Sequence, residues 1–410
     1  MITILLIIIY LAFISLGLPD ALFGTAWPAM YSEFGVGISA AGICSILVSG
    51  GTIISSFFSG VMIRRFGTGK VTAVSVLMTA VALIGISFTG SFVWLCVLAI
   101  PLGLGAGSVD AALNNFVALH YEARHMSWLH CFWGIGASMG PVIMSGVLSR
   151  GFEWNTGYAI VGTIQSILVL VLFLALPLWK KLEASPSKEN DQSNETSLSL
   201  KKVLQMPGAK PVLVAFFCYC AVEATTGLWG STYLVLHRGF SADAAAKWVS
   251  AFYVGITFGR FLSGFLTMKV SNKTLIRLGE GLIVIGIVMI LLPFSVPILL
   301  GIGFFILGLG CAPIYPCMIH NTPITFGKEA SQSMMGVQMA FAYVGSTFIP
   351  PLFGLITQYI SVRLLPGYLF LFTILMIVMV EALNHRKQLG IEEESERIES
   401  KFAMKKESKG

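Results

Sequence analysis

The sequence is poor in charge: Asp, Glu, Lys and Arg together make up 11% of its 410 residues, whereas 56% are hydrophobic. The mean hydropathy of +0.83 is far above that of a water-soluble domain, which could not bury so much apolar surface. Short segments of alternating hydrophobicity, which a transmembrane β-barrel requires, are also lacking. Long apolar runs follow one another instead, and about 20 such residues cross a ~30 Å hydrocarbon layer. The fold class is therefore predicted to be an all-α polytopic membrane protein.

Motifs of enzymes, metal sites and cofactor sites are missing as well. The seven cysteines lie in apolar stretches at irregular spacings, without a CxxC or Cys/His pattern, and are predicted to be small buried hydrophobes. No HExxH, GxSxG, Walker lysine loop or dinucleotide fingerprint is present. We therefore expect no enzyme, no cofactor, no metal and no transport driven directly by ATP. The formal charge of +6 requires no nucleic-acid partner, because a cytoplasmic face against anionic lipid accounts for it.

Charged residues, together with Gly and Pro between the apolar stretches, divide the chain into twelve predicted helices. The only long polar connection covers residues 180–210 and is predicted to be a disordered cytoplasmic linker. Residues 1–179 and 211–384 then form two six-helix bundles, and residues 385–410 form a disordered cytoplasmic tail. The predicted helices begin near Thr3, Ile38, Val71, Phe92, Ser127, Gly157, Pro211, Ala245, Thr274, Val296, Ser331 and Leu365.

The distribution of lysine and arginine predicts the orientation in the membrane. Most of them fall on one side if both termini are cytoplasmic, as the positive-inside rule requires. The first eighteen residues lack a basic region and a small-residue cleavage site, so they are interpreted as the first helix and not as a cleaved signal. We expect a monomer in the lipid bilayer of a bacterial cell membrane.

The two halves resemble each other at a spacing of about half the chain, which predicts a duplication. An even number of helices per half places the repeats in parallel, around an axis along the membrane normal. The matching pairs are Gly51 with Gly255, Phe57 with Phe261, Ser59 with Ser263, Gly60 with Gly264, and residues 102–105 with residues 307–310.

Three carboxylates inside predicted helices are the candidates for proton coupling. Ionisable groups in hydrocarbon are costly, so they are functional candidates by default. Asp20 follows Pro19, which loosens the first helix locally. Asp110 lies on the fourth helix, and Glu223 on the seventh helix occupies almost the position that Asp20 holds in the first half. The alternative for each is a hydrogen bond to a neighbouring helix that serves packing alone.

Polar and aromatic residues near these carboxylates are the candidates for solute binding. Asn114 and Asn115 form a polar patch with Asp110, and such a patch should face water or a solute. The alternative is an interhelical hydrogen-bond clamp, and a lone histidine on an apolar helix is more often structural. The predicted binding residues are Trp27, Asn114, Asn115, His130, Trp229, His320, Asn321 and Gln338.

Three arginines are predicted to form a cytoplasmic gate. Arg64 and Arg65 lie in SGVMIRRFGTGK after the second helix, and Arg260 lies in GRFLSG on the eighth. Glycines there allow close helix packing, and cations suit helix C-termini. Contact with the solute is the alternative for Arg260. Glu280 is expected to form an interfacial ion pair with Arg277.

Twelve helices in two halves, the central linker and SGVMIRRFGTGK resemble the major facilitator superfamily over residues 1–384. The loop departs from that family's GxxxDRxGRR pattern, because Arg64 stands where an acidic residue is usual. The first-helix aspartate, SVDAALNNF and LHCFWGIGASMGP are similar to the fucose/glucose-type sugar:proton symporter branch. That resemblance implies that Asp20, Asp110 and Asn114 or Asn115 couple protonation to sugar binding.

These observations predict a secondary active transporter that moves a small polar solute, with a sugar favoured, by proton symport and alternating access. The alternative is a proton-coupled exporter of drugs or metabolites. A transporter-like sensor or scaffold belongs to a third class, and the short tail without a recognisable domain argues against it.

Overall fold

The computed structural model describes residues 2–121, 123–183, 200–293 and 297–385. This part of the chain contains helices and no strand, and twelve of its helices are long and apolar enough to cross a membrane, so the predicted fold class is confirmed. In chain order the elements are α1 (Ile2–Asp20), α2 (Leu22–Glu33), η1 (Ile38–Ala40), α3 (Ala41–Phe66), α4 (Thr68–Ser87), α5 (Phe92–His120), α6 (Ala123–Leu148), α7 (Trp154–Leu174), α8 (Leu176–Glu183), α9 (Leu200–Gln205), α10 (Ala209–Leu236), α11 (Ala242–Leu266), α12 (Asn272–Leu291), α13 (Pro297–Phe326), α14 (Lys328–Tyr359) and η2 (Val362–Leu364).

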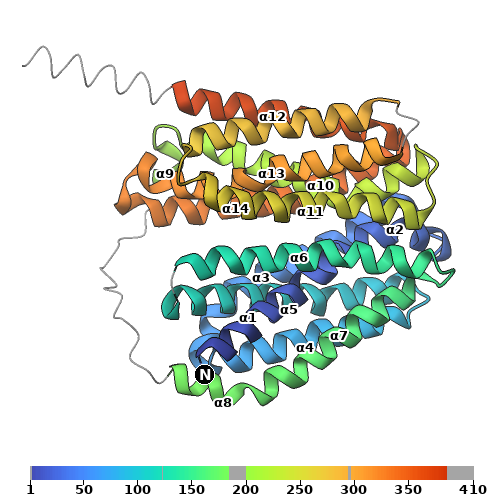
Figure 1. Cartoon of the computed structure of the whole chain (residues 1–410), viewed down its shortest axis with the longest axis horizontal. Coiled ribbons are helices and arrows are strands. Elements are labelled where there is room, and N and C mark those ends of the chain that lie inside the picture. Colours follow the sequence, from blue (N-terminus) through green and yellow to red (C-terminus); the bar gives the residue numbers. More distant parts are fainter. Residues whose placement is uncertain (1, 122, 184–199, 294–296, 386–410) are drawn as a thin grey trace, which may run out of the picture.

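The helices form two bundles that lie side by side in Figure 1, one built from α1–α8 and the other from α10 to the last span, Val362–His385. The predicted starts of the helices agree with the observed spans to within a few residues. Large apolar side chains such as Phe57 and Leu174 are each 82% exposed. Such a surface suits lipid rather than water.

The first membrane span is broken where the sequence places a proline. α1 ends at Asp20 and α2 begins at Leu22, with Pro19 in the last turn of α1. Proline lacks the N–H that would close the helix and clashes with the preceding turn. The predicted loosening is confirmed, and it leaves the Asp20 side chain at an interruption in the middle of the span.

Two short helices lie at the edges of the segment that was predicted to be a disordered linker. α8 extends to Glu183 and α9 begins at Leu200, so disorder is the wrong prediction for both edges. Each helix is held by an apolar side chain: Trp179 is 1% exposed and packs on Gly69, and Val203 is fully buried. Residues 184–199 and the predicted tail, apart from its first residue, lie outside the described residues.

The packing within the two bundles repeats in the way that the sequence pattern predicts. A Cβ atom on Gly51 of α3 would lie 2.9 Å from the amide nitrogen of Leu104 on α5. A Cβ atom on Gly255 of α11 would lie 2.9 Å from the amide nitrogen of Leu309 on α13. Equivalent glycines therefore bring equivalent helix pairs together, which small residues permit in membranes.

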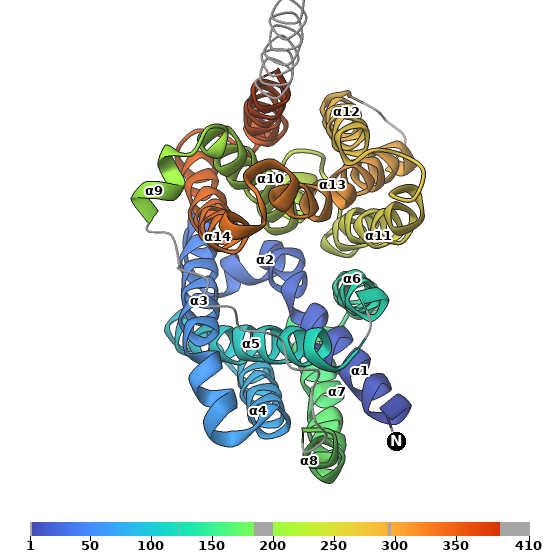
Figure 2. The ribbon, with the colours of Figure 1, turned by 90° about the vertical axis from the view of Figure 1, so that its left-hand side faces the viewer.

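The two bundles touch at the end of the molecule where α2 and α14 end, which we call the far end; α8 ends and α9 begins at the opposite, linker end (Figures 1 and 2). Gly24 of α2 packs on Gly227 of α10. The hydroxyl of Ser145 near the end of α6 donates to the carbonyl oxygen of Asp243 at the start of α11, at 2.8 Å. The hydroxyl of Ser39 in η1 donates to the side chain of Gln358. These contacts between the halves all lie in the far half of the molecule.

Candidate functional site

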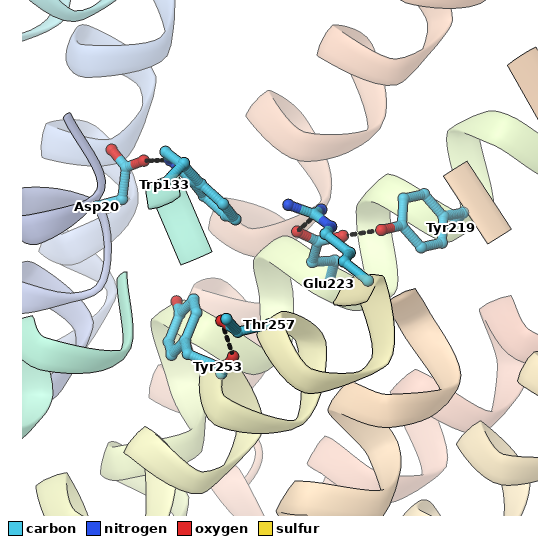
Figure 3. A network of polar contacts seen from close by, with 7 residues as sticks. Asp20, Trp133, Tyr219, Glu223, Tyr253 and Thr257 are labelled. Atoms are coloured by element: carbon cyan, nitrogen blue, oxygen red, sulfur yellow. Dashed lines mark hydrogen bonds and ion pairs between the residues drawn. The ribbon is translucent and has the colours of Figure 1, made fainter. Parts of the chain in front are cut away.

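A chain of polar contacts crosses between the two halves (Figure 3). It begins at Asp20, whose carboxylate oxygen Oδ2 accepts a 2.7 Å hydrogen bond from the indole Nε1 of Trp133 on α6. The backbone of α1 ends at this position, so the carboxylate can turn toward α6. Asp20 is exposed although it lies midway along a membrane span, and this exposure indicates that the region is reached by water.

The indole ring of Trp133 also contacts the C-terminal half. The guanidinium carbon of Arg260 on α11 lies 4.9 Å from the centre of an indole ring, in a cation–π contact. Arg260 Nη2 also lies 3.8 Å from Glu223 Oε1 on α10. The hydroxyl of Tyr219, one turn before Glu223, donates to its other carboxylate oxygen. Asp20 and Glu223 thus hold comparable positions in the two halves, and Trp133 with Arg260 lies between them.

Further polar groups line the contact between α6 and α11. The hydroxyl oxygens of Ser138 and Thr257 lie 3.4 Å apart across the two halves. Thr257 also donates to the backbone carbonyl of Tyr253 at 2.8 Å. Gly134 leaves room for this approach, because a Cβ atom there would overlap Thr257.

Asp110 forms a second polar group on the N-terminal half. Its carboxylate Oδ1 accepts a 2.9 Å hydrogen bond from Asn114 Nδ2, one turn further along α5. Asp110 and Asn114 are half-buried, and Asn115 is exposed. The hydroxyls of Tyr315 and Tyr343, on α13 and α14, lie within electrostatic range of Asp110 from the opposite half. Asp110 and Asn114 thus form a hydrogen-bonded pair on this helix, and the predicted part of this patch in solute binding stays a prediction.

Two tryptophans predicted to bind the solute do not fit that role in this structure. Trp27 and Trp229 are both 0% exposed. The indole N–H of Trp27 donates to the carbonyl oxygen of Ile38 at 2.9 Å, and that of Trp229 donates to the carbonyl oxygen of Pro350 at 2.8 Å. Trp27 therefore links α2 to η1, and Trp229 links α10 to α14, inside the protein. Sequence spacing placed them near the carboxylates but could not show which way they point.

Three other predicted binding residues lie on helices of the C-terminal half, apart from the central contacts. His320 and Asn321, near the end of α13, both bond to the side-chain amide of Asn272 at 2.9 Å. Gln338 on α14 is 0% exposed and accepts a 2.8 Å hydrogen bond from Thr322. These contacts join α12, α13 and α14 to one another.

His130 lies on α6, one turn before Trp133. It is half-buried, and its ring meets the edge of Phe13 on α1 with the ring centres 5.9 Å apart. It lies close enough to Arg260 for their charges to interact. His130 is thus at the border of the central contacts, and its predicted part in solute binding stays a prediction.

The predicted arginine gate has different partners in the structure. Arg64 and Arg65 are exposed in the last turn of α3, whereas Arg260 contacts Trp133 and Glu223. A gating role for the three together stays a prediction, and so does the alternative that Arg260 contacts the solute.

The expected ion pair between Arg277 and Glu280 is wrong. Arg277 makes a bidentate pair with Glu381 of the last span, with nitrogen–oxygen distances of 2.6 and 2.5 Å. The fork geometry of a guanidinium suits such a pair. Glu280 is 3% exposed, and its Oε1 has no hydrogen-bond partner among the residues that the structure describes.

Sequence reasoning missed Trp133, Tyr219 and Tyr253 as members of the site. Trp133 lies in the motif LHCFWGIGASMGP, and the motif alone gives no reason to prefer Trp133 over the histidine before it. Only the crossing of α6 with α11 brings its ring between Asp20 and Arg260. Among the described residues there is no cluster of three or more His, Cys, Asp or Glu side chains that could hold a metal ion.

The arrangement can be compared with known proteins. The family model of the Major Facilitator Superfamily matches residues 9–248 and 243–406. The chain belongs to this superfamily. It is an integral multi-pass membrane protein that transports small-molecule solutes, and not an enzyme. The resemblance inferred from the sequence is confirmed at this level.

Superfamily members with several kinds of solute are similar to this chain. It is 24% identical to the glucose/mannose transporter GlcP of Bacillus subtilis, over 80% of this chain and 82% of the relative. It is 23% identical to the cis,cis-muconate transport protein of Acinetobacter baylyi, over 59% and 60% of the two chains. A crystal structure of a mutant of the nucleoside transporter NupG has a TM-score of 0.73 at 13% identity and covers 92% of this chain and 98% of that one. This structural likeness shows the fold alone.

Proposed function

We propose that this protein takes up a small polar solute, with a sugar favoured, together with protons, by alternating access. The contacts that join Asp20 to Glu223 through Trp133 and Arg260 are the observation that carries the proposal. These contacts include groups whose charge can change, and they lie where the two halves meet and would move against each other. A transporter that only let a solute diffuse would not need ionisable groups at this place.

The carboxylates of the N-terminal half are the candidates for binding the transported proton. Within the described part of the chain, an ion pair joins Arg260 to Glu223, whereas no ion pair is formed by Asp20 or Asp110. Enclosing an unpaired carboxylate in a site that closes is costly, and a bound proton removes that cost. We therefore favour Asp20 and Asp110 over Glu223 as proton carriers.

The groups around Asp110 suit a polar, ring-shaped solute. Asn114 offers an amide, and Tyr315 and Tyr343 offer half-buried aromatic side chains. Aromatic faces cover the apolar side of a ring, while amides and hydroxyls bond to its polar edge. A sugar has both features. The similarity to a glucose/mannose transporter supports the same choice.

The far-end contacts between the halves indicate the side of the membrane from which the central groups are reached in the observed state. If both termini are cytoplasmic, the halves touch at the outer side and the central groups are reached from the cytoplasm. The opposite state requires these contacts to open and the linker end to close. Rocking of two repeats around a fixed site is the movement expected of such a fold.

The test is external alkalinisation by lightly buffered, energy-depleted cells that express the protein, after each of a panel of hexoses and deoxyhexoses is added. We expect prompt alkalinisation with one sugar and its loss in Asp20→Asn or Asp110→Asn at equal expression. If both variants keep proton-driven accumulation, the assignment of the carboxylates is wrong. If no sugar gives a response and the protein is at the membrane, the exporter becomes the better hypothesis.

A further inference from the structure

We propose that Trp133 is a positioning residue that transmits the charge state of Asp20, in the N-terminal half, to the Arg260–Glu223 pair in the C-terminal half. This inference rests on the proton coupling proposed above and names the side chain through which it acts. Trp133 need not touch the solute for this role. It needs two contacts at once, one with each half.

Both contacts are present, and they use different parts of one ring. The indole edge donates its N–H to Asp20 Oδ2 at 2.7 Å, and the indole face receives the guanidinium of Arg260 at 4.9 Å. Tryptophan provides a hydrogen-bond donor together with a strong cation–π surface. Phenylalanine provides only the surface, and leucine provides neither. The position is thus specific for the side chain that it holds.

The charge of Asp20 affects both contacts in the same direction. An ionised carboxylate strengthens the indole hydrogen bond and fixes the ring. Hydrogen bonds in series polarise one another, so electron density on the ring rises and the attraction for Arg260 increases. Protonation of Asp20 weakens both contacts. Arg260 then loses part of its link to α6 and keeps its ion pair with Glu223, which lies 3.8 Å away.

Other titratable groups around Asp20 and Arg260 lie on α5, α6, α10 and α11. Asp110 of α5 and Tyr253 of α11 lie within electrostatic range of the Asp20 carboxylate. His130 on α6 and Glu223 on α10 both interact with Arg260. A change in the protonation of Asp110, His130 or Glu223 would alter the same network. The experiment therefore has to fix the charge of Asp20 itself by substitution.

Comparison with two other tryptophans separates this role from plain packing. Trp27 and Trp229 are 0% exposed, and their indole N–H groups donate to backbone carbonyls. Trp133 is half-buried, and its N–H donates to a carboxylate whose charge can change. An ordinary structural tryptophan does not require a titratable acceptor. The pairing of Trp133 with Asp20 fits a group that responds to protonation.

A measurement that needs no solute tests the inference directly. Amide hydrogen exchange of α11 is compared by mass spectrometry in purified wild type, Asp20→Asn, Trp133→Phe and the double variant. Asp20→Asn keeps the shape of the side chain but removes the charge. We expect Asp20→Asn and Trp133→Phe each to speed exchange around Arg260, and the double variant to match the single ones. Coupled residues are non-additive in this way.

The matched control is Trp94→Phe, because Trp94 on α5 is 62% exposed and lies on the outside of the bundle. It should leave exchange of α11 unchanged. The inference is overturned if Asp20→Asn speeds exchange of α11 by the same amount in the wild-type protein and in the Trp133→Phe variant. It is also overturned if Asp20→Asn changes nothing in α11.

Transport in proteoliposomes then separates this inference from the proposed function. With a sugar that the wild type accumulates, Trp133→Phe should keep sugar exchange but lose accumulation driven by a proton gradient by about tenfold. A merely structural tryptophan would lower both together. Wild type that moves no protons with any sugar contradicts the proposed function, and hydrogen exchange still decides the role of Trp133. If Trp133→Phe accumulates the sugar to the wild-type level, the role of Trp133 is contradicted but the proposed function is not.

Discussion

Gly24 of α2 lies directly against Gly227 of α10, so that a Cβ atom on Gly24 would be 2.8 Å from Leu228 Cα and closer still to the Gly227 carbonyl oxygen. The two glycines belong to equivalent helices of the two halves. Their contact brings the backbones of these helices together at the far end. The absence of side chains at this crossing is therefore what allows the far end to close.

Gly24→Ala should shift the protein away from the observed state. The added methyl group meets backbone atoms, which cannot rotate aside, and overpacking of this kind costs about 1–3 kcal/mol. An equilibrium between two orientations then shifts by roughly 5- to 150-fold. Faster hydrogen exchange in α2 and α10 would reveal the opening, and uptake should fall as well.

Gly50→Ala is the matched control for this change. Gly50 lies on α3, and a Cβ atom there would have no neighbour within 4 Å. It should leave exchange and uptake at the wild-type level. Equal effects of Gly24→Ala and Gly50→Ala would contradict the interpretation of the far end as a closed gate.

Gln165→Leu should destabilise the N-terminal bundle. Gln165 on α7 is 1% exposed, accepts a 2.5 Å hydrogen bond from Thr79 of α4 and donates a 2.7 Å hydrogen bond to the carbonyl oxygen of Ser15 on α1. The leucine leaves the carbonyl oxygen of Ser15 without its side-chain donor, at a cost of about 1–3 kcal/mol, whereas the Thr79 hydroxyl keeps its bond to the carbonyl oxygen of Val76. The melting temperature in detergent should fall, whereas Ser166→Ala, which removes a bond within α7 alone, should change it little.

Trp229→Phe should lower stability without changing the apparent affinity for the solute. The phenyl ring keeps most of the packing but leaves the carbonyl oxygen of Pro350 without its donor. Thermal unfolding and the concentration dependence of uptake measure the two effects separately. A large rise in KM at an unchanged melting temperature would restore the earlier hypothesis that Trp229 binds the solute.

The sequence predicted the helices, and the presence of three carboxylates inside them, because both depend on local chemistry. Apolar length defines each span, and Asp20, Asp110 and Glu223 stand out because charge is rare inside hydrocarbon. The direction in which a side chain points depends on helix crossings. Trp133 and Trp229 look alike in the sequence, yet one contacts a carboxylate and the other a backbone carbonyl. No local pattern contains that difference.

The prediction of an ion pair on α12 was wrong for the same reason. The spacing of Arg277 and Glu280 suggested a pair within one helix. The last span brings Glu381 to Arg277 instead, and Glu280 is 3% exposed, with no hydrogen-bond partner for its Oε1 in the part of the chain that the structure describes. A buried carboxyl group without full hydrogen bonding is costly, and an apolar side chain of similar size removes this cost. Glu280→Met should therefore raise the melting temperature by a few degrees and leave uptake unchanged, because Glu280 lies outside the contacts between Asp20 and Glu223. A loss of proton-driven uptake at normal stability would show instead that this carboxyl group belongs to the transport mechanism.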